Sequence, residues 1–321
     1  MRMLDIPVRA VLMANVLAGK FYILLLICMN AIALAIIFRQ VRHASSNIRR
    51  TSTAATGFAS NPVIRTTEES LYVMYGERDL ADDAHLSNYI RSMTSRQAPG
   101  GRHLSSKPSR VHFSQVGGSQ LVDKLLKQRR NGFFVESGAF NGEEYSDTLF
   151  FEMQRNWTGI LIEPHPHYYH SILQKNRNAL ALRACLSHTT RPVFTRFRLH
   201  GWGSGVSALD KNVKPGNKNV PQTDVQCFSL NSIMTAIGVH HIDFMVLDVE
   251  GSELPVLQSI DWTKLSVDVF SIEYSCTKRL DKLEKIRSYF KNETGFSYKE
   301  MGTLPMKNPK STAQDVIFMR V

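Results

Sequence analysis

Residues 133–142 constrain the fold more than any other part of the chain. In this stretch an apolar run ends in a carboxylate, Glu136, and a turn with two glycines, Gly138 and Gly142, follows. Beyond the turn, apolar residues recur every four positions, which predicts a helix over residues 143–155. A strand, an acidic tip, a glycine turn and a helix together form the opening unit of a nucleotide-binding α/β sheet.

A second carboxylate supports this interpretation. The buried-strand run 159–163 ends in Glu163, about twenty residues beyond the glycine turn, and in dinucleotide-type sites an acid at that spacing binds both ribose hydroxyls. The glycine spacing is not the GxGxxG pattern that favours a pyrophosphate, which argues against a Rossmann-type oxidoreductase. An ordinary strand–turn–helix corner with an exposed glutamate is the alternative interpretation.

Strand and helix patterns alternate through the rest of the chain. Further strands are predicted at 179–185, 192–199, 225–228, 242–250, 267–274, 296–300 and 315–320. Helices between them, such as the one that Ser229 can cap, predict an α/β fold: a doubly wound, mostly parallel sheet with helices on both faces. The last two strands are separated only by a loop, which predicts an antiparallel strand at the sheet edge.

The N-terminal region differs in composition from the rest. Residues 21–38, from Phe21 to Phe38, carry no charge. At about 1.5 Å per residue they are long enough to cross a bilayer core of about 30 Å. A buried core helix or a cleaved signal peptide are the alternatives, and we expect a signal anchor. The domain prediction is a cytosolic tail over 1–20, the transmembrane segment, a flexible basic stem over 39–80 and a folded domain over 81–321.

The formal net charge of +11 is concentrated in the first 130 residues. No zinc-finger spacing and no RNP-type aromatic motif accompanies it, so we expect no nucleic-acid partner. A basic stem beside an anionic lipid bilayer is the simpler interpretation.

Cysteines and glycosylation sequons bear on the compartment. No cysteine belongs to a CxxC pair, so no zinc or other metal site is predicted. Cys185 and Cys227 each lie in a predicted strand; they form a disulfide if the domain is lumenal and remain thiols if it is cytosolic. Two sequons, at Asn156 and Asn292, favour a lumenal domain, and hence a single-pass type II protein with a cytosolic N-terminus.

The chain resembles the FkbM-type methyltransferase family over roughly residues 80–321. The matching segments are 133–142, 156–164, 184–187, 242–257 and 271–274. A span, a stem and this domain in series resemble the animal Star-like proteins, single-pass proteins of the secretory pathway linked to vesicle traffic. The resemblance implies a class I methyltransferase fold, a Rossmann-like seven-stranded sheet that uses S-adenosylmethionine.

The resemblance also implies residue roles. Cofactor contacts would come from Glu136, Gly138, Asn141, Gly142 and Glu163. Glu136 would face the methionine amine, and Glu163 would hold the ribose hydroxyls. Asp248 and Glu250 would end a strand beside the transferred methyl group, with Asp248 as a candidate base for a hydroxyl acceptor. Weaker candidate bases are His200, His240 and His241.

Two functions follow from these expectations. The first is a membrane-anchored O-methyltransferase of the ER, Golgi or endosomes that acts on a glycan or lipid hydroxyl. The second is a non-catalytic trafficking protein that binds membrane-protein cargo with the same fold.

Overall fold

The structure is a computed structural model, and it describes residues 83–96, 98, 100–199, 221–274, 280–305 and 314–321. Its strands are β1 (Thr94–Ser95), β2 (Phe133–Ser137), β3 (Thr158–Ile162), β4 (Leu180–Leu182), β5 (Cys185–Leu186), β6 (Val193–Arg198), β7 (Gln222–Phe228), β8 (His241–Leu247), β9 (Ser266–Glu273), β10 (Tyr298–Pro305) and β11 (Gln314–Arg320). Its helices are α3 (Ala84–Met93), α4 (Gly118–Leu125), α5 (Leu149–Gln154), α6 (Pro166–Lys175), α7 (Leu230–Ile237), α8 (Glu253–Gln258) and α9 (Leu280–Asn292).

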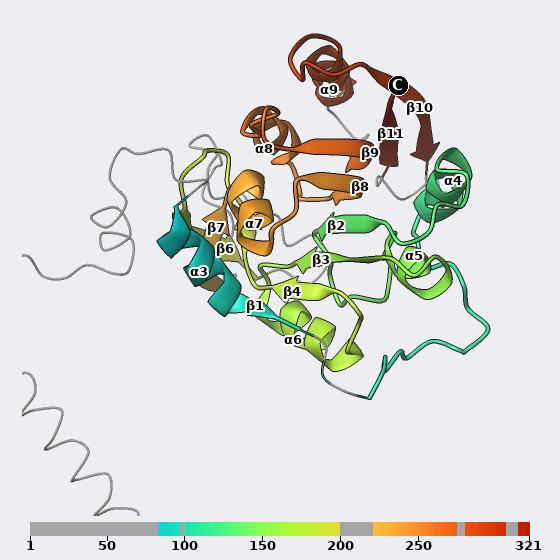
Figure 1. Cartoon of the computed structure of the whole chain (residues 1–321), viewed down its shortest axis with the longest axis vertical. Helices are drawn as coiled ribbons and strands as arrows, with labels where there is room; N and C mark the ends of the chain where they lie inside the picture. The colour runs from blue at the N-terminus through green and yellow to red at the C-terminus, as the bar shows by residue number, and fades with distance from the viewer. Residues whose placement is uncertain (1–82, 97, 99, 200–220, 275–279, 306–313) are drawn as a thin grey trace, which may run out of the picture. The chain divides into compact units, whose positions relative to one another are not determined.

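Eight of the strands form one sheet in the order β1-β4-β3-β2-β8-β9-β11-β10 (Figure 1). β4, β3, β2, β8 and β9 are parallel to one another. β11 runs antiparallel between β9 and the edge strand β10, and the short β1 is antiparallel at the other edge. This order confirms the predicted Rossmann-like class I methyltransferase fold, mostly parallel with antiparallel pairing toward the edge.

Helices cover both faces of this sheet, as the alternation of strands and helices predicts. Successive residues of β2 point to different cores because side chains alternate along a strand. Val135 lies in the core that α3, α7, α8 and α9 cover. Phe134 lies in the core that α4, α5 and α6 cover. Both side chains are fully buried, so β2 is a central strand packed on both sides.

The strand order reverses between β2 and β8. From β2 the chain continues to β3 and β4 on one side, and later it returns through β8 and β9 on the other side. In open α/β sheets, ligands bind in the crevice outside the carboxyl ends of the strands at such a switch point. The fold therefore directs attention to the loops that follow β2, β3, β8 and β9.

The predicted helix over 143–155 is wrong in its first part, because α5 begins only at Leu149. The hydroxyls of Ser146 and Thr148 donate to the carboxylate of Glu136 at 2.8 and 2.6 Å. These hydrogen bonds hold the segment before α5 in an irregular conformation, in which Tyr145 has a φ of 63°. In the segment before α5, hydrogen bonds to the buried Glu136 therefore have more influence on the backbone than the helical periodicity of the sequence.

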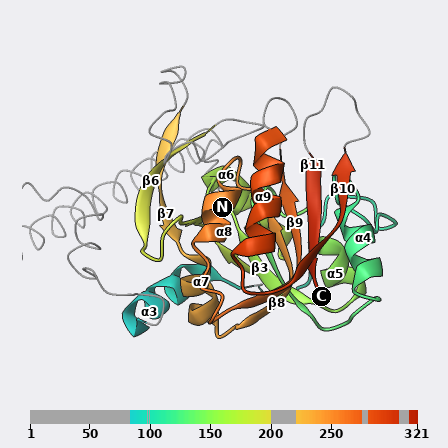
Figure 2. The ribbon, with the colours of Figure 1, turned by 90° about the horizontal axis from the view of Figure 1, so that it is seen from above.

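The predicted strand 179–185 is also divided. Its first part is β4 of the large sheet, and its last residue, Cys185, begins β5. β5 pairs with β7, and β7 pairs with β6, in a separate three-stranded sheet. β6 and β7 lie side by side, apart from the large sheet (Figure 2). A disulfide bond joins Cys185 to Cys227 of β7, where the two Cα atoms are 4.3 Å apart.

Within the described ranges, no helix has the length and apolar character needed to cross a bilayer. The predicted span from Phe21 to Phe38, the stem over 39–80 and His200 lie outside the described residues.

Candidate functional site

Four carboxylates gather at one edge of the large sheet. Glu163 follows β3, Asp248 follows β8 and Glu273 ends β9. Asp315 lies at the start of the antiparallel β11, opposite Glu273 in register. Parallel strands end at the same edge, and an antiparallel strand begins there, so all four side chains belong to the edge that contains the switch point.

The carboxylate of Glu163 is buried and holds the glycine loop. Its Oε2 accepts the backbone amide of Phe140, and its Oε1 accepts the amide of His165, both at 2.8 Å. Among the described residues no cation forms an ion pair with it, and burial raises its pKa to about 8 in spite of the two amides. A carboxylate offers about four acceptor positions, so each oxygen keeps one for a further donor. A vicinal diol supplies two such donors.

Aromatic side chains lie next to this carboxylate. The ring centroid of Tyr168 is 4.2 Å from that of Phe140 and 4.3 Å from that of His165. Phe197 of β6 meets His165 edge-on, with centroids 6.2 Å apart. Burial lowers the pKa of His165. A neutral, flat group of rings beside a buried acceptor suits a planar aromatic ligand that carries hydroxyl groups.

Gly138 is needed where two loops of this edge meet. Its φ is 84°, and a Cβ at this position would overlap the carbonyl oxygen of Asp248. The amide of Asp248 in turn donates to the carbonyl oxygen of Ser137 at 3.0 Å. The sequence predicts a glycine that lets the backbone approach a ligand; the close neighbour in the structure is the loop after β8.

Asn141 and Gly142 shape the glycine loop. The Oδ1 atom of Asn141 accepts the amides of Glu143 and Glu144 at 3.0 and 2.9 Å. Gly142 has a φ of 78°, and an added Cβ would lie 3.1 Å from Ile172 of α6. Both residues stabilise the turn from within, and their contact with the cofactor stays a prediction.

Glu136 has partners within the protein that the sequence does not predict. Its side chain is buried, and its oxygens accept the Asp147 amide at 2.9 Å in addition to the two hydroxyls before α5. The guanidinium of Arg177 lies 3.4 Å away. The carboxylate thus accepts several donors from the protein, and its contact with a methionine amine stays a prediction.

Arg177 is a site-forming residue that sequence reasoning missed. Its side chain is 1% exposed, and its Nε donates to Glu152 at 2.9 Å. Its Nη1 also donates to the carbonyl oxygen of Gly142, at 2.9 Å. Arg177 therefore ties the glycine loop to α5. An isolated arginine between two predicted elements carries no sequence signal for this role.

Asp248, which follows β8, and Glu273, which ends β9, share a hydrogen bond. Burial and then the nearby Glu273 raise the pKa of Asp248 well above its ordinary value. Burial and then Glu250 and Glu253 raise the pKa of Glu273 to about 7, although the hydrogen bond to Asp248 opposes the shift. Carboxyl groups this close cannot both ionise readily, so the pair keeps one proton when Glu273 ionises.

The loop after β8 is organised by a second acid that sequence reasoning missed. Glu253 is fully buried, and its Oε1 accepts the amides of Val249 and Gly251 at 3.2 and 3.0 Å. Lys282 of α9 pairs with its Oε2 at 2.7 Å. Glu250 is exposed on this turn, with a φ of 55°. β8 ends at Leu247, so the predicted catalytic acids follow the strand instead of ending it.

Comparison with models of known protein families identifies the family of this chain. The family described as the methyltransferase FkbM domain matches residues 136–298, which is half of the chain. The chain belongs to the FkbM methyltransferase family. The match spans β2 to the start of β10, and it includes Glu163, Asp248 and Glu273.

Three solved methyltransferase structures match this chain at low sequence identity. The FkbM methyltransferase of Methylobacillus flagellatus KT is 13% identical with a TM-score of 0.37, over 72% of this chain and 50% of that chain. Precorrin-6y C5,15-methyltransferase of Geobacter metallireducens GS-15 is 12% identical with a TM-score of 0.35, over 67% and 93%. The 1,6-didemethyltoxoflavin-N1-methyltransferase of Burkholderia thailandensis, bound to S-adenosylhomocysteine, is 14% identical with a TM-score of 0.32, over 63% and 76%. No curated protein matches the sequence.

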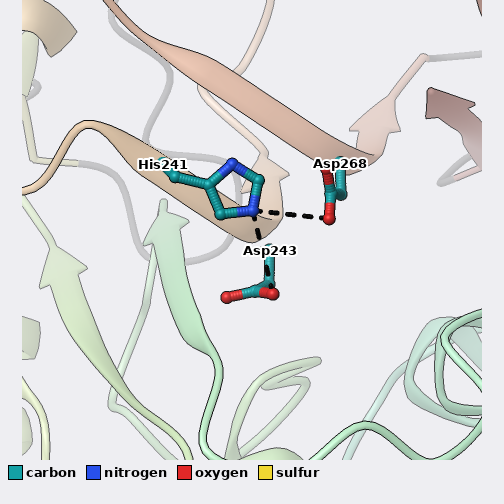
Figure 3. Close-up of side chains that lie close together, drawn as sticks. All are labelled: His241, Asp243 and Asp268. Carbon is teal, nitrogen blue, oxygen red and sulfur yellow. Dashed lines mark ion pairs between the residues drawn. The ribbon is translucent and has the colours of Figure 1, made fainter.

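Two of the histidines predicted as weaker candidate bases, His240 and His241, lie at the amino end of β8, away from the candidate site. β8 begins at His241, directly after His240. The Nε2 atom of His241 is 3.4 Å from Asp268 and 3.9 Å from Asp243 (Figure 3). Because the switch point lies at the carboxyl end of the strand, neither histidine belongs to the candidate site.

Two groups of described side chains have the spacing to hold a metal ion: His241, Asp243 and Asp268, and Asp248, Glu253 and Glu273. In the first group, Nη1 of Arg129 already pairs with Asp268 at 2.7 Å and also with Asp243. In the second group, Lys282 pairs with Glu253. These cations compete with any metal, and the absence of a metal site stays a prediction.

The two sequon asparagines lie on the surface of the FkbM domain. Asn156 is exposed with a φ of 58°, and its Nδ2 donates to Asn131 at 2.7 Å. Asn292 is exposed at the end of α9. Glycosylation at either position stays a prediction.

Proposed function

We propose that this FkbM-family chain is an S-adenosylmethionine-dependent O-methyltransferase. The observation that carries the proposal is Glu163, a buried carboxylate at the switch point that no described cation neutralises. Its two oxygens hold the glycine loop through backbone amides and keep acceptor positions for a diol. The rings of Phe140 and Tyr168 beside it suit an adenine base.

The residues present fit this cofactor. Glu163 would accept hydrogen bonds from the ribose hydroxyls, and donation from a diol favours the charged carboxylate, which lowers its raised pKa. When bound, S-adenosylmethionine supplies a methyl group already activated on a sulfonium. The chain must then position an acceptor hydroxyl and remove its proton.

The Asp248–Glu273 pair is the proposed base. With one shared proton, the pair retains one carboxylate that can accept the proton of an acceptor hydroxyl. A base that titrates near neutral pH is well matched to this task. Asp248 is contributed by the loop that packs on Gly138, so the base and the glycine loop are held at a fixed separation.

We also propose that the enzyme is a single-pass type II membrane protein whose domain lies in the lumen of the ER, Golgi or endosomes. The uncharged segment from Phe21 to Phe38 supports the anchor. The Cys185–Cys227 disulfide supports an oxidising compartment. In this setting the acceptor would be a hydroxyl of a membrane glycan or lipid.

Transfer of a labelled methyl group tests this function. Full-length protein in detergent is incubated with S-adenosylmethionine, labelled at the methyl group, and a membrane extract that supplies glycan and lipid acceptors. We expect an alkali-stable methyl ether, formed at a rate that rises with pH through about 7, where Glu273 ionises and the pair gains the carboxylate that acts as the base.

Asp248→Asn should lower the rate at least about 100-fold and leave cofactor binding intact, whereas the exposed Glu284→Gln should change neither. Cofactor binding without transfer to any acceptor would contradict the enzyme proposal. It would favour the non-catalytic role of a Star-like protein in membrane traffic.

A further inference from the structure

A polar cavity of about 460 Å³ lies beside the glycine loop. Its walls come from residues 105–110, from residues 141–144 and from Lys175 at the end of α6. Serine, asparagine, glutamate and cationic side chains line it, and no aromatic or aliphatic side chain does. Asn141, which lines the cavity, directly follows Phe140, whose amide binds Glu163. The cavity is therefore one residue along the chain from the proposed cofactor site.

Glu143 fixes one wall of the cavity. It is buried, and its carboxylate accepts the amides of Ser105 and Ser106 at 2.8 and 2.7 Å, as well as the Ser106 hydroxyl. Lys175 pairs with the same carboxylate. Burial raises the pKa of Glu143, but the hydrogen bonds from Lys175 and the two serines lower it to about 2. The Glu143 carboxylate therefore stays charged at neutral pH, and its hydrogen bonds hold residues 105 and 106 in this wall.

A tight turn over residues 107–110 contributes two cations, Lys107 and Arg110, to the lining of the cavity. The amide of Arg110 donates to the carbonyl oxygen of Lys107 at 2.9 Å, and Pro108 occupies the second position of this turn. The two Cα atoms at the ends of such a turn lie within about 7 Å of each other. Arg110 Nε donates to the carbonyl oxygen of His112 at 3.1 Å, and its guanidinium lies 4.8 Å from the Phe113 ring centroid. The Arg110 side chain is therefore held in place.

The charges around the cavity do not balance at this turn. The lining side chains comprise three cations and two carboxylates, which leaves a net charge of +1. Lys175 neutralises Glu143, whereas Glu144 accepts a hydrogen bond from Asn141 at 3.0 Å and keeps its charge. Within the described part of the chain, neither Lys107 nor Arg110 has an acidic partner. Two neighbouring cations repel each other, and an anion bound between them removes that repulsion.

We propose that this cavity binds a phosphate ester, with the phosphoryl oxygens on Lys107 and Arg110. The planar guanidinium suits a phosphoryl group because it can donate two parallel hydrogen bonds, and the adjacent ammonium adds a second charge. The hydroxyl of Ser109 is the nearest further donor on the turn. The carboxylate of Glu144, which also lines the cavity, can accept a hydroxyl of the esterified group. Assigning that group to the methyl acceptor rests on the proposed function, whereas the phosphate site does not.

Calorimetric titration of the full-length protein, in a detergent free of phosphorus, tests the site. The probes are inorganic phosphate and glycerol 3-phosphate at constant ionic strength, with glycerol as the uncharged control. We expect glycerol 3-phosphate to bind and glycerol not to bind. Lys107→Ala combined with Arg110→Ala should weaken glycerol 3-phosphate binding at least about tenfold. The matched variant, Arg196→Ala with Lys285→Ala, removes the same charge elsewhere and should change it less than about twofold.

Equal weakening in the two double variants would overturn the site, as would the absence of saturable binding at about 20 mM phosphate or ester. Vesicles of phosphatidic acid in phosphatidylcholine, compared with phosphatidylcholine alone, distinguish a lipid ester from a soluble one. Competition between glycerol 3-phosphate and S-adenosylmethionine would show that the cavity is part of the cofactor site. That result would overturn the assignment of the cavity to the methyl acceptor. Phosphate ester binding without any S-adenosylmethionine binding would contradict the proposed function and leave this site standing.

Discussion

At the scale of single residues, Arg177 shows how buried charge shapes the site. It lies between Glu136 and Glu152, and all three side chains are almost completely buried. Removing one partner of such a group leaves uncompensated charge in the interior, which costs far more than the pair contributes. The glycine loop depends on this arrangement because Arg177 also binds the carbonyl oxygen of Gly142.

We expect Arg177→Met to lower the free energy of unfolding by about 3–5 kcal/mol. The methionine keeps much of the side-chain volume but leaves the buried Glu136 without a cation and Glu152 with only the half-exposed Arg102 as its partner. Denaturant unfolding of the full-length protein measures the change. Arg130→Met is the matched control, because Arg130 is exposed and, among the residues that the structure describes, its side chain donates only to the carbonyl oxygen of Gln154. A loss no larger than in the control would contradict this account of the buried group.

Gly138 can be tested against a second glycine with a similar backbone. Gly238 ends α7 with a φ of 72° and has no atom near an added Cβ, whereas a Cβ at Gly138 meets Asp248. Gly238→Ala should cost about 1–2 kcal/mol from the left-handed backbone alone. Gly138→Ala should cost clearly more and should weaken cofactor binding, since the loop after β8 must move. Equal costs in unfolding experiments would show that the close approach does not matter.

The roles of single residues were only partly predictable. Glu163 was found from its spacing after the glycine turn, and Asp248 from its place after a buried strand. Glu273 is a residue that sequence reasoning missed as a site residue, although it ends the next parallel strand and therefore belongs to the same edge. The partners of Glu136 were not predicted, because its position at a strand tip carries no information about the hydroxyls and the arginine that contact it.

At the scale of elements, the small sheet depends on a covalent link as well as on its strand pairing. Cys185 and Cys227 face each other in the parallel pair β5–β7, and 42 residues separate them in the chain. Sequence reasoning left this pair open, because strand membership alone does not show that two strands are neighbours. β4 and β5 were predicted as one strand for the same reason.

Reduction of this disulfide should destabilise the domain. Closing a loop of this length contributes up to about 4 kcal/mol through the entropy of the unfolded chain. We therefore expect a reductant to shift the denaturant midpoint of the full-length protein to lower concentration. Cys185→Ser with Cys227→Ser should show the lower midpoint without reductant and no further shift with it. An unchanged midpoint in reduced wild-type protein would contradict a stabilising role.

At the scale of the whole molecule, the alternation of strands and helices was enough to predict the doubly wound sheet and its antiparallel edge. The same periodicity could not predict where α5 begins, because hydrogen bonds to Glu136 decide that point. The fold brings loops from distant parts of the chain to the switch point. One carboxylate there, Glu163, connects the glycine loop to the start of α6 and remains without a described cation.

The central claim is that this carboxylate holds the ribose of S-adenosylmethionine. Isothermal titration of the cofactor into the full-length protein tests it most directly, with Glu163→Ala compared with Glu144→Ala, an exposed glutamate of the neighbouring turn. Loss of two hydrogen bonds to a charged acceptor should weaken binding at least about 100-fold in Glu163→Ala, whereas Glu144→Ala should bind like the wild type. Equal affinities in all three proteins, or no binding by the wild type, would contradict the account.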